Sequence, residues 1–276
     1  MTDSASTGEL KTDLVVHRHG RSPGPGVPTL FLLHGLTDSG SGWPEGVRHW
    51  QDRYAIVAVD QRGHGLSPRF TEDELDRHPG DLFVQDAVSV LEQLDRPVVV
   101  GHSMGGAVAL AAAVRRPELV RALVLEDPAP RGPEEQHPSG RGKEFLAGVQ
   151  QSLAAPDEEA LYRLRKEQHP DWPDSELLVT GLAEQQMDLA FLERGEYKPT
   201  TPWTELFAAV SVPTLVVSGD RADEVVIGHE IEAGIARIAN PLVTLVRIGD
   251  AGHCIRREQP EEFYRTVDDW LAGLGA

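Results

Sequence analysis

The chain has 276 residues, with 26 Lys and Arg against 44 Asp and Glu, so its formal net charge at pH 7 is −18. So acidic a surface repels phosphate groups, which argues against nucleic acid as a partner and against docking on an anionic membrane. The single cysteine cannot form an internal disulfide, so the fold does not depend on an oxidising compartment. The first ten residues lack the basic and apolar regions of a signal peptide, and we expect a cytoplasmic protein.

Short apolar runs alternate with helical patterns along the chain, which predicts a parallel β-sheet with crossover helices. An edge strand is expected at Leu14–His17. Buried strands are expected at six runs rich in Val, Leu and Ile: Thr29–Leu33, Tyr54–Val59, Pro97–Val100, Ala122–Leu125, Thr214–Val217 and Val243–Ile248. Helical patterns occupy Asp81–Leu94, Gly105–Val114 and Glu261–Leu271. No residue from Pro97 to Val114 carries a formal charge, but a β-branched run followed by a small-residue helix explains this stretch better than a membrane span.

The alternation of strands and helices stops between residues 128 and 208, where the sequence is polar and favours helices. We therefore expect an α/β core made of residues 1–127 and 209–276, with a helical cap inserted at 128–208 over one end of the sheet. Five large side chains of this segment can either line an apolar pocket or pack the cap onto the sheet: Tyr162, Trp172, Met187, Phe191 and Trp203.

A G-x-S-x-G motif, Gly101–Gly105 (GHSMG), directly follows one of the expected strands. The three fixed positions alone are weak evidence, but a strand before them and a small-residue helix after them give the setting of a nucleophile elbow. The turn forces Ser103 into a strained conformation, and the flanking glycines remove Cβ atoms that would collide with neighbouring elements. The Ser103 hydroxyl then stands at a helix N-terminus, where amide groups favour developing negative charge.

Three further stretches, together with the elbow, resemble motifs of the α/β-hydrolase fold family in the family's order. They are Leu33–Leu36 (LHGL), Asp60–Ser67 (DQRGHGLS) and Gly249–His253 (GDAGH). The resemblance runs from about Thr29 to Leu271. It implies an α/β fold with a mostly parallel central sheet flanked by helices, and a hydrolase of small molecules that uses neither a cofactor nor a metal.

The chemistry of ester cleavage assigns roles to several of these residues. Ser103 would attack a carbonyl carbon, but a serine hydroxyl is a poor nucleophile and needs a base. His253 is the candidate, because it follows the last strand in a Gly-rich turn that can bring its ring to the serine. The backbone N–H groups of Met104 and Leu36 would form the oxyanion hole, and the side chains of Leu36 and Trp43 are candidates to line the acyl pocket.

The other histidines are expected to be structural or exposed. His34, His64 and His102 lie in family turns, where such side chains pack or form structural hydrogen bonds. The remaining seven are most simply solvated: His17, His19, His49, His78, His137, His169 and His229. His17 and His19 lack a third ligand, so no zinc site is expected. Cys254 is expected to be a buried thiol without a catalytic part.

The acid that would orient His253 is ambiguous. The family places it after the strand at Thr214–Val217, which gives the chain order Ser, Asp, His. Asp220 fits without a gap a branch of the family in which G-D precedes a short loop, an apolar pair and a Glu, here Val226, Ile227 and Glu230. We favour Asp220. Asp223, which needs one inserted residue, and Asp127, at a site that some family members use, remain alternatives.

The resemblance implies a serine hydrolase that cleaves a carboxylic ester or lactone through an acyl-enzyme on Ser103. Serine at the elbow argues against haloalkane dehalogenases and most epoxide hydrolases, which use a carboxylate nucleophile. The alternatives are a hydrolase of carbon–carbon bonds with the same triad, a hydrolase of a cyclic natural-product ester, and a ligand-binding receptor of this fold with little turnover. The net charge of −18 favours neutral substrates by long-range repulsion of anions. The sequence does not indicate an oligomeric state.

Overall fold

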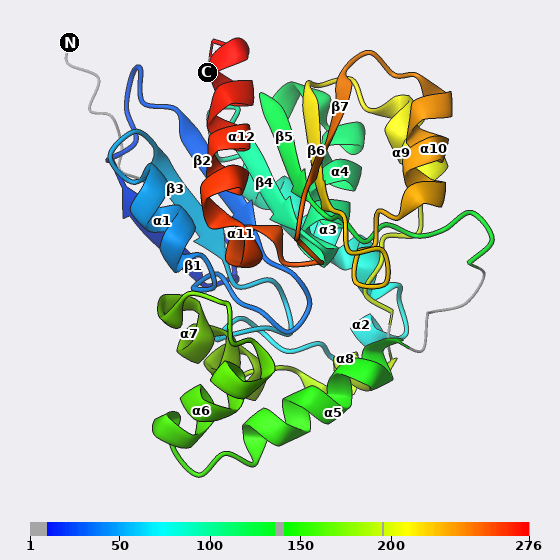
Figure 1. Ribbon diagram of the computed structural model, residues 1–276. Coiled ribbons are helices and arrows are strands. Elements are labelled where there is room, and N and C mark those ends of the chain that lie inside the picture. The colour runs from blue at the N-terminus through cyan, green and yellow to red at the C-terminus, as the bar shows by residue number, and fades with distance from the viewer. Residues whose placement is uncertain (1–9, 136–140, 195, 276) are drawn as a thin grey trace.

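The computed structural model describes residues 10–135, 141–194 and 196–275. Within these residues one sheet is formed in the order β1-β3-β2-β4-β5-β6-β7 (Figure 1). Its strands are β1 (Val16–Gly20), β2 (Thr29–Leu33), β3 (Ala55–Val59), β4 (Val98–His102), β5 (Ala122–Glu126), β6 (Thr214–Gly219) and β7 (Val243–Ile248). β1 runs antiparallel to β3 and every other pairing is parallel. The expected mostly parallel sheet is therefore confirmed.

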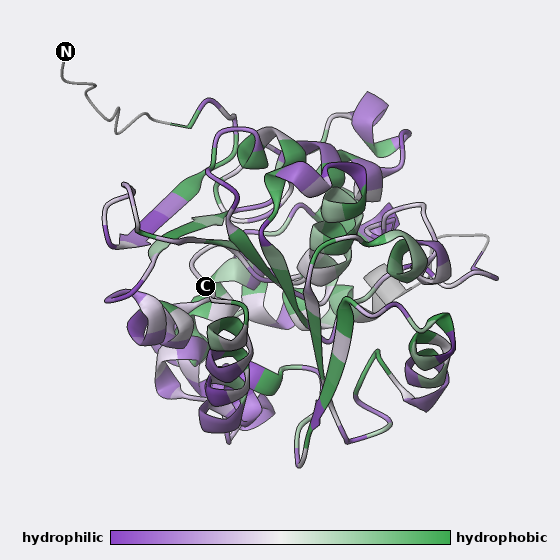
Figure 2. Cartoon of the chain, turned by 90° about the horizontal axis from the view of Figure 1, so that it is seen from above, coloured by the Kyte–Doolittle hydropathy of each residue, from purple (hydrophilic) through white to green (hydrophobic). Residues whose placement is uncertain are grey.

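Helices cover both faces of the sheet (Figures 1 and 2). One face carries α1 (Pro44–Trp50), α11 (Ile255–Glu258) and α12 (Pro260–Gly273), and the other carries α3 (Pro79–Leu91), α4 (Met104–Arg115), α9 (Trp203–Ala209) and α10 (His229–Ile238). The short helices α2 (Glu72–Leu75) and η1 (Pro117–Leu119) lie in connections. Both faces of the central strands are thus buried, which is why their sequences are continuous apolar runs.

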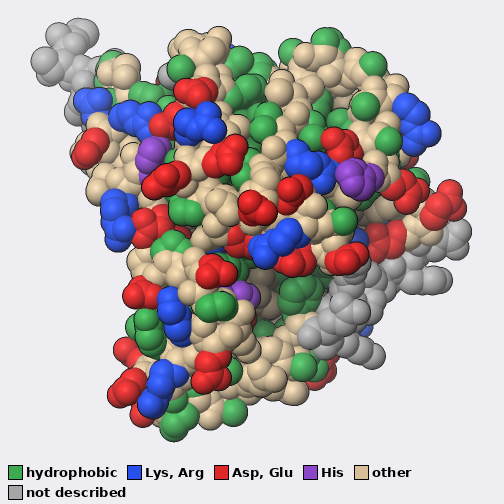
Figure 3. Space-filling model, viewed as in Figure 1, with side chains coloured by type: hydrophobic (Ala, Val, Ile, Leu, Met, Phe, Trp, Pro, Cys, Tyr) green, Lys and Arg blue, Asp and Glu red, His purple; other side chains and the backbone are tan. Residues whose placement is uncertain are grey.

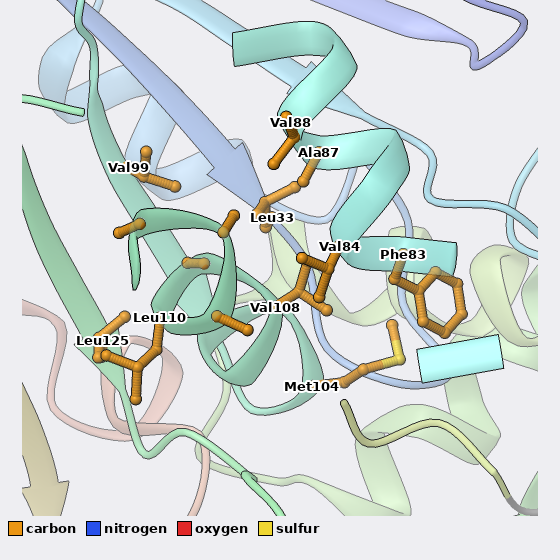
Figure 4. Close-up of a cluster of buried hydrophobic side chains, with 14 of the residues drawn as sticks. Leu33, Phe83, Val84, Ala87, Val88, Val99, Met104, Val108, Leu110 and Leu125 are labelled. Carbon is orange, nitrogen blue, oxygen red and sulfur yellow. The ribbon is translucent and has the colours of Figure 1, made fainter. Parts of the chain in front are cut away.

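Successive residues of each strand contribute to two separate cores. On β2, Phe31 and Leu33 pack towards α3 and α4, while Leu30 and Leu32 pack towards α1 and α12. Figure 4 shows the first of these cores, in which side chains of α3 and α4 meet those of the strands. Each fully buried Leu or Val contributes about 1.5–3 kcal/mol, so the sheet is a firm platform for the loops that follow its strands.

Between β5 and β6 the chain leaves the sheet and forms α5 (Arg141–Leu153), α6 (Glu158–Gln168), α7 (Asp174–Gln185) and α8 (Leu189–Arg194). These helices lie beyond the carboxyl ends of the strands (Figure 1). An isolated bridge pairs Arg131 with Pro202, and the Trp203 N–H donates to the Arg131 carbonyl at 2.8 Å. The insertion therefore leaves and rejoins the core at one place.

Helix α9 begins within the range expected for the cap but packs against α4 and α10 beside the sheet. A Cβ atom on Gly234 of α10 would lie 2.2 Å from the ring of Trp203, so the glycine permits this close approach. The uncharged stretch from Pro97 to Val114 is accounted for by β4 and α4. In the described part of the chain, every helix is too short or too polar to span a bilayer.

Candidate active site

Ser103 lies in the turn between β4 and α4, with φ 52° and ψ −115°. Its backbone N–H donates to the carbonyl of Glu126 on β5 at 3.0 Å, which ties the strained turn to the neighbouring strand. The glycines at the turn are sterically required: a Cβ atom on Gly105 would lie 2.2 Å from the carbonyl oxygen of Leu33, and one on Gly101 would lie 2.5 Å from that of Gly105. The local sequence thus fits the geometry expected for a nucleophile elbow.

A continuous line of hydrogen bonds joins Ser103, His253 and Asp127. His253 Nε2 lies 2.9 Å from Ser103 Oγ, and His253 Nδ1 lies 2.6 Å from Asp127 Oδ2. Because a carboxylate only accepts hydrogen bonds, the imidazole proton lies on Nδ1, and Nε2 is left free to accept the Ser103 hydroxyl proton. The structure therefore brings the expected nucleophile and the expected base into contact, together with a carboxylate that can orient the base.

The structure places Asp127, and not the favoured Asp220 or the alternative Asp223, against His253. Asp220 and Asp223 are both exposed, and the Asp220 backbone N–H donates to the carbonyl of Ala251. Asp127 is fully buried at the end of β5 with φ 36°, a conformation that turns its side chain to His253. Because β5 and β6 are neighbouring parallel strands, the turns after both approach the same histidine, and their sequences do not reveal which carboxylate faces inward.

The turn after β6 holds Asp127 in place. The N–H groups of Val226 and Ile227 donate to Asp127 Oδ2 and Oδ1 at 2.8 and 2.9 Å, and Ser218 Oγ donates to Oδ1 at 3.4 Å. Hydrogen bonds to an ionised carboxylate are about twice as strong as neutral ones. Val226 and Ile227, the apolar pair in the sequence pattern that favoured Asp220, thus hold Asp127 through their backbone N–H groups.

The three histidines of the family turns make structural hydrogen bonds. The Gln61 N–H donates to His34 Nε2 at 2.9 Å, so His34 Nδ1–H donates to the carbonyl of Gly35 at 2.8 Å. His64 is buried beside His34, and burial lowers its pKa to about 3. His102 Nε2–H donates to the carbonyl of His253 at 3.1 Å, which fixes the backbone of the candidate base. Burial holds the pKa of His102 well below its usual value.

A buried network of charges supports the loops around Ser103. Arg256 donates to Glu126 at 2.8 Å, and its guanidinium lies 4.1 Å from the centre of the Trp43 ring. Trp43 is therefore covered by Arg256, and it does not line the cavity at Ser103. The burial of these charges is compensated because each arginine meets a carboxylate.

Arg257 extends the network to the inserted helices. Its Nη2 donates to Asp38 at 2.7 Å and its Nε donates to Glu176 of α7 at 2.7 Å. Both carboxylate groups are buried. Arg257 thus fastens α7 to the short helix that follows His253, and so sets the position of the insertion above the site.

A cavity of about 370 Å³ opens at Ser103, between the carboxyl ends of the strands and helices α5 to α7. The surface is hollowed between these two parts, and charged side chains surround the hollow (Figure 3). The core contributes Leu36, Ser103 and His253, and the insertion contributes Phe145, Arg165 and Trp172. The volume is near the lower end of the range for small-molecule sites, which suits a compact substrate.

Of the five large residues expected either to line a pocket or to pack the cap, only Trp172 lines this cavity. Met187 and Phe191 belong to the core, where Phe191 stacks on Phe70 with ring centres 4.9 Å apart. Trp203 packs on α10, and Tyr162 lies away from the cavity.

Several polar residues of the cavity were not predicted from the sequence to line it, among them Arg165, His169 and Arg257. His169 was expected to be solvated, but its ring stacks on Trp172 at 3.8 Å. Burial and two nearby arginines lower its pKa to about 4. Among the remaining histidines expected to be solvated, His17 instead donates from Nε2 to Asp60 Oδ1 at 2.8 Å, and His137 lies outside the described residues. No local motif marks these positions.

Cys254 also lines the cavity, and burial raises the pKa of its thiol to about 11. The group is therefore a neutral thiol at physiological pH, not a thiolate nucleophile. Across the residues that the structure describes, no three His, Cys, Asp or Glu side chains are grouped so that they could hold a metal ion.

Comparison with known proteins identifies a matching family and similar lipases. The model of a family described as "Alpha/beta hydrolase family" matches residues 30–266. Lipase LipV of Mycobacterium tuberculosis is 31% identical over 269 residues, covering 92% of this chain and 96% of the lipase. The mouse sn-1-specific diacylglycerol lipase ABHD11 is 27% identical, covering 89% of this chain and 81% of that protein.

Solved structures share the fold at lower identity. The N-formylmaleamic acid deformylase of Pseudomonas putida S16 superposes with a TM-score of 0.73 at 20% identity, covering 92% of this chain and 96% of the deformylase. An esterase from a marine microorganism superposes with a TM-score of 0.70 at 21% identity, covering 94% of this chain and 99% of the esterase.

Proposed function

Because the chain belongs to the alpha/beta hydrolase family, we propose that it is a serine hydrolase of a small to medium carboxylic ester or lactone. The hydrogen-bonded line from Ser103 through His253 to Asp127 carries the proposal. Its similarity to lipases along nearly the whole chain supports ester cleavage.

The reaction proceeds through an acyl-enzyme. His253 Nε2 takes the hydroxyl proton of Ser103 as Oγ attacks the substrate carbonyl carbon, and the resulting oxyanion accepts hydrogen bonds from the N–H groups of Leu36 and Met104. When the tetrahedral intermediate collapses, His253 gives its proton to the leaving alcohol. Water, deprotonated by His253, then attacks the acyl carbon, and the carboxylic acid leaves as Ser103 recovers its proton. Asp127 keeps the proton on Nδ1 throughout.

The loop geometry supports Leu36 and Met104 as the oxyanion donors. Met104 is the first residue of α4, and Leu36 lies in the turn after β2. That turn packs directly on the nucleophile, since a Cβ atom on Gly35 would lie 3.3 Å from Ser103 Cβ. Removal of one such donor from an oxyanion hole costs about 3–4 kcal/mol of transition-state stabilisation.

Helices α5 to α8 act as a cap in this proposal. They belong to the segment 128–208, and they cover the carboxyl ends of the strands where Ser103 lies. By excluding water from the cavity, a cap strengthens the electrostatic interactions that stabilise the oxyanion. Helix α9, which packs beside the sheet, belongs with the core.

Labelling with a fluorophosphonate probe tests the proposal. The wild-type protein should label at one serine and hydrolyse short and medium 4-nitrophenyl esters, and Ser103→Ala should lose both properties. Ser218→Ala, which removes another serine hydroxyl near Asp127, serves as the matched control and should still label. Folded wild-type protein that is inert to the probe and to the ester panel would contradict esterase chemistry; turnover of diketones alone would indicate carbon–carbon hydrolysis instead.

A further inference from the structure

Arg165 of α6 lies inside the protein, on the cap side of the cavity that contains Ser103. Only 8% of its side chain is exposed. Its Nη1 donates to Glu184 at 3.0 Å and to Gln168 at 2.9 Å. Its Nε is buried with no hydrogen-bond partner, and within the described residues its Nη2 makes no hydrogen bond either. Such an orphaned donor is uncommon in folded proteins and calls for a ligand or a functional explanation.

The two unoccupied nitrogens form one edge of the guanidinium plane. Nε–H and Nη2–H are nearly parallel, and this edge matches the two oxygens of a carboxylate. Burial strengthens such a contact, because the guanidinium is withdrawn from water and the pair is only weakly screened by salt.

The other charged groups of the cavity are already engaged. Arg257 donates from Nε to Glu176 and from Nη2 to Asp38, so its corresponding edge is occupied. Glu184 accepts from Arg165 and also from Ser152 Oγ at 2.5 Å, and burial raises the pKa of this carboxyl group. Arg165 therefore pairs with a single carboxyl group, through Nη1, and the edge formed by its Nε and Nη2 is not used.

We propose that Arg165 binds a carboxylate of the substrate, so that this hydrolase acts on esters or lactones that carry a second, anionic group. The proposal rests on the proposed function. Arg165 comes from the cap and Ser103 from the strand edge, and the cavity of about 370 Å³ joins them. The carboxylate and the scissile carbonyl are consequently separated by a short spacer, which Phe145 and Trp172 can contact.

Arg165 would favour an anionic substrate, whereas the net charge of −18 led us to expect a neutral one. The acidic surface slows the approach of an anion by long-range repulsion, whereas the Arg165 guanidinium would stabilise the bound anion by direct contact. For an anionic ester, kcat/KM should therefore rise as salt is added at low ionic strength, and the selectivity for the anion should persist at high salt.

The experiment compares matched esters. The acyl pair is 4-nitrophenyl hydrogen glutarate and 4-nitrophenyl pentanoate; the alcohol pair is the pentanoate esters of 4-hydroxybenzoate and 4-hydroxybenzamide. In the wild type at 0.2 M salt, kcat/KM for the anionic member of at least one pair should exceed that for the neutral member by about tenfold or more. The ratio within one variant cancels any loss common to both substrates.

Arg165→Met should bring this ratio to about one or below, and Arg165→Lys should lose most of it because an ammonium group lacks the paired edge. The control is Arg163→Met on the same helix, whose side chain is exposed and pairs with Glu159. It should keep the wild-type ratio. Since Arg165→Met leaves Glu184 buried without its partner, the double variant Arg165→Met/Glu184→Met provides a second test that removes both charges.

Binding gives a readout independent of turnover. Calorimetry on Ser103→Ala with glutaramate should show binding that Arg165→Met weakens by about tenfold or more. Wild-type protein that labels with fluorophosphonate and cleaves both members of each pair, but prefers the neutral ones or keeps its ratio in Arg165→Met, would overturn the inference alone. Protein that neither labels nor cleaves any ester would overturn the proposed function.

Discussion

Replacing Asp127 by Asn tests the arrangement of the acid with almost no change in side-chain volume. Asp127 is buried, and its two oxygens accept from His253, Val226, Ile227 and Ser218. An amide can accept at only one of the two positions, because its other end is a donor.

Either orientation of the new amide is unfavourable. If the Asn oxygen faces Ile227, the NH₂ group meets the Val226 N–H and the His253 Nδ1, so the ring moves its proton to Nε2 and can no longer take one from Ser103. The corresponding change in a serine protease lowers kcat about 10⁴-fold, or about 5.4 kcal/mol. If the oxygen faces His253, the Ile227 N–H loses its acceptor, which costs about 1–3 kcal/mol of stability.

We expect Asp127→Asn to lower kcat for 4-nitrophenyl acetate by about 10³- to 10⁴-fold. Initial rates at saturating ester measure kcat, and thermal unfolding followed by circular dichroism separates this loss from loss of fold. Asp220→Asn and Asp223→Asn, both at exposed positions, should stay within about threefold of wild type. If Asp127→Asn remained within tenfold of wild type while Asp220→Asn fell by three orders of magnitude, Asp127 would not be the acid that orients His253.

Three further outcomes follow from buried groups. Burial lowers the pKa of His64 to about 3 from 6.5, so below pH 6.5 the unfolded state binds more protons and stability falls. Urea titrations between pH 6 and 4 measure how the free energy of unfolding changes with pH. This change should be smaller in His64→Asn than in the wild type by up to about 1.4 kcal/mol per pH unit, and an equal change in both proteins would contradict the expectation. Glu176→Ala leaves Arg257 without one buried partner and should reduce the free energy of unfolding by about 3 kcal/mol, against less than about 0.5 kcal/mol for the exposed Glu159→Ala. Gly105→Ala places a Cβ atom against the Leu33 carbonyl and should lower stability by about 2 kcal/mol or more, measured by the same titration, where a neutral result would show that the turn can relax.

The elements that local pattern specifies were predicted well. Thr29–Leu33 is a continuous apolar run because helices bury both of its faces, and both this strand and the edge strand Val243–Ile248 have the expected bounds. The turn at Ser103 was also predictable, since it needs only a preceding strand, a following helix and glycines at fixed positions. Its contact with His253 follows from the shared carboxyl edge of parallel strands.

The acid could not be chosen from the sequence, because the choice depends on how two neighbouring turns orient their side chains. Asp127 points inward because the Val226 and Ile227 amides, about one hundred residues further along the chain, meet its oxygens. A family pattern that places the acid after Thr214–Val217 contains no information on that contact.

Arg165 was missed for a related reason. Helix α6 has the sequence EEALYRLRKEQ, a charge pattern typical of a solvated helix. The arginine is buried only because α7 packs closely against α6, where a Cβ atom on Gly181 would lie 2.7 Å from Leu161 Cγ. Packing between two helices, and not the pattern of either one, places a cation in the cavity.

The bridge between Arg131 and Pro202 marks where the inserted helices leave and rejoin the core that carries Ser103, Asp127 and His253. The segments bearing Ser103 and Asp127 are complete before the bridge, and the segment bearing His253 follows it, so the length of the chain between the bridged residues does not set their spacing. A segment that replaced the residues between them would keep its two ends paired, but it would also have to supply the buried contacts that Glu176 makes with Arg257 and Phe191 makes with Phe70. Exchange of this segment would then change the substrate specificity, while the spacing of Ser103, Asp127 and His253 stays the same.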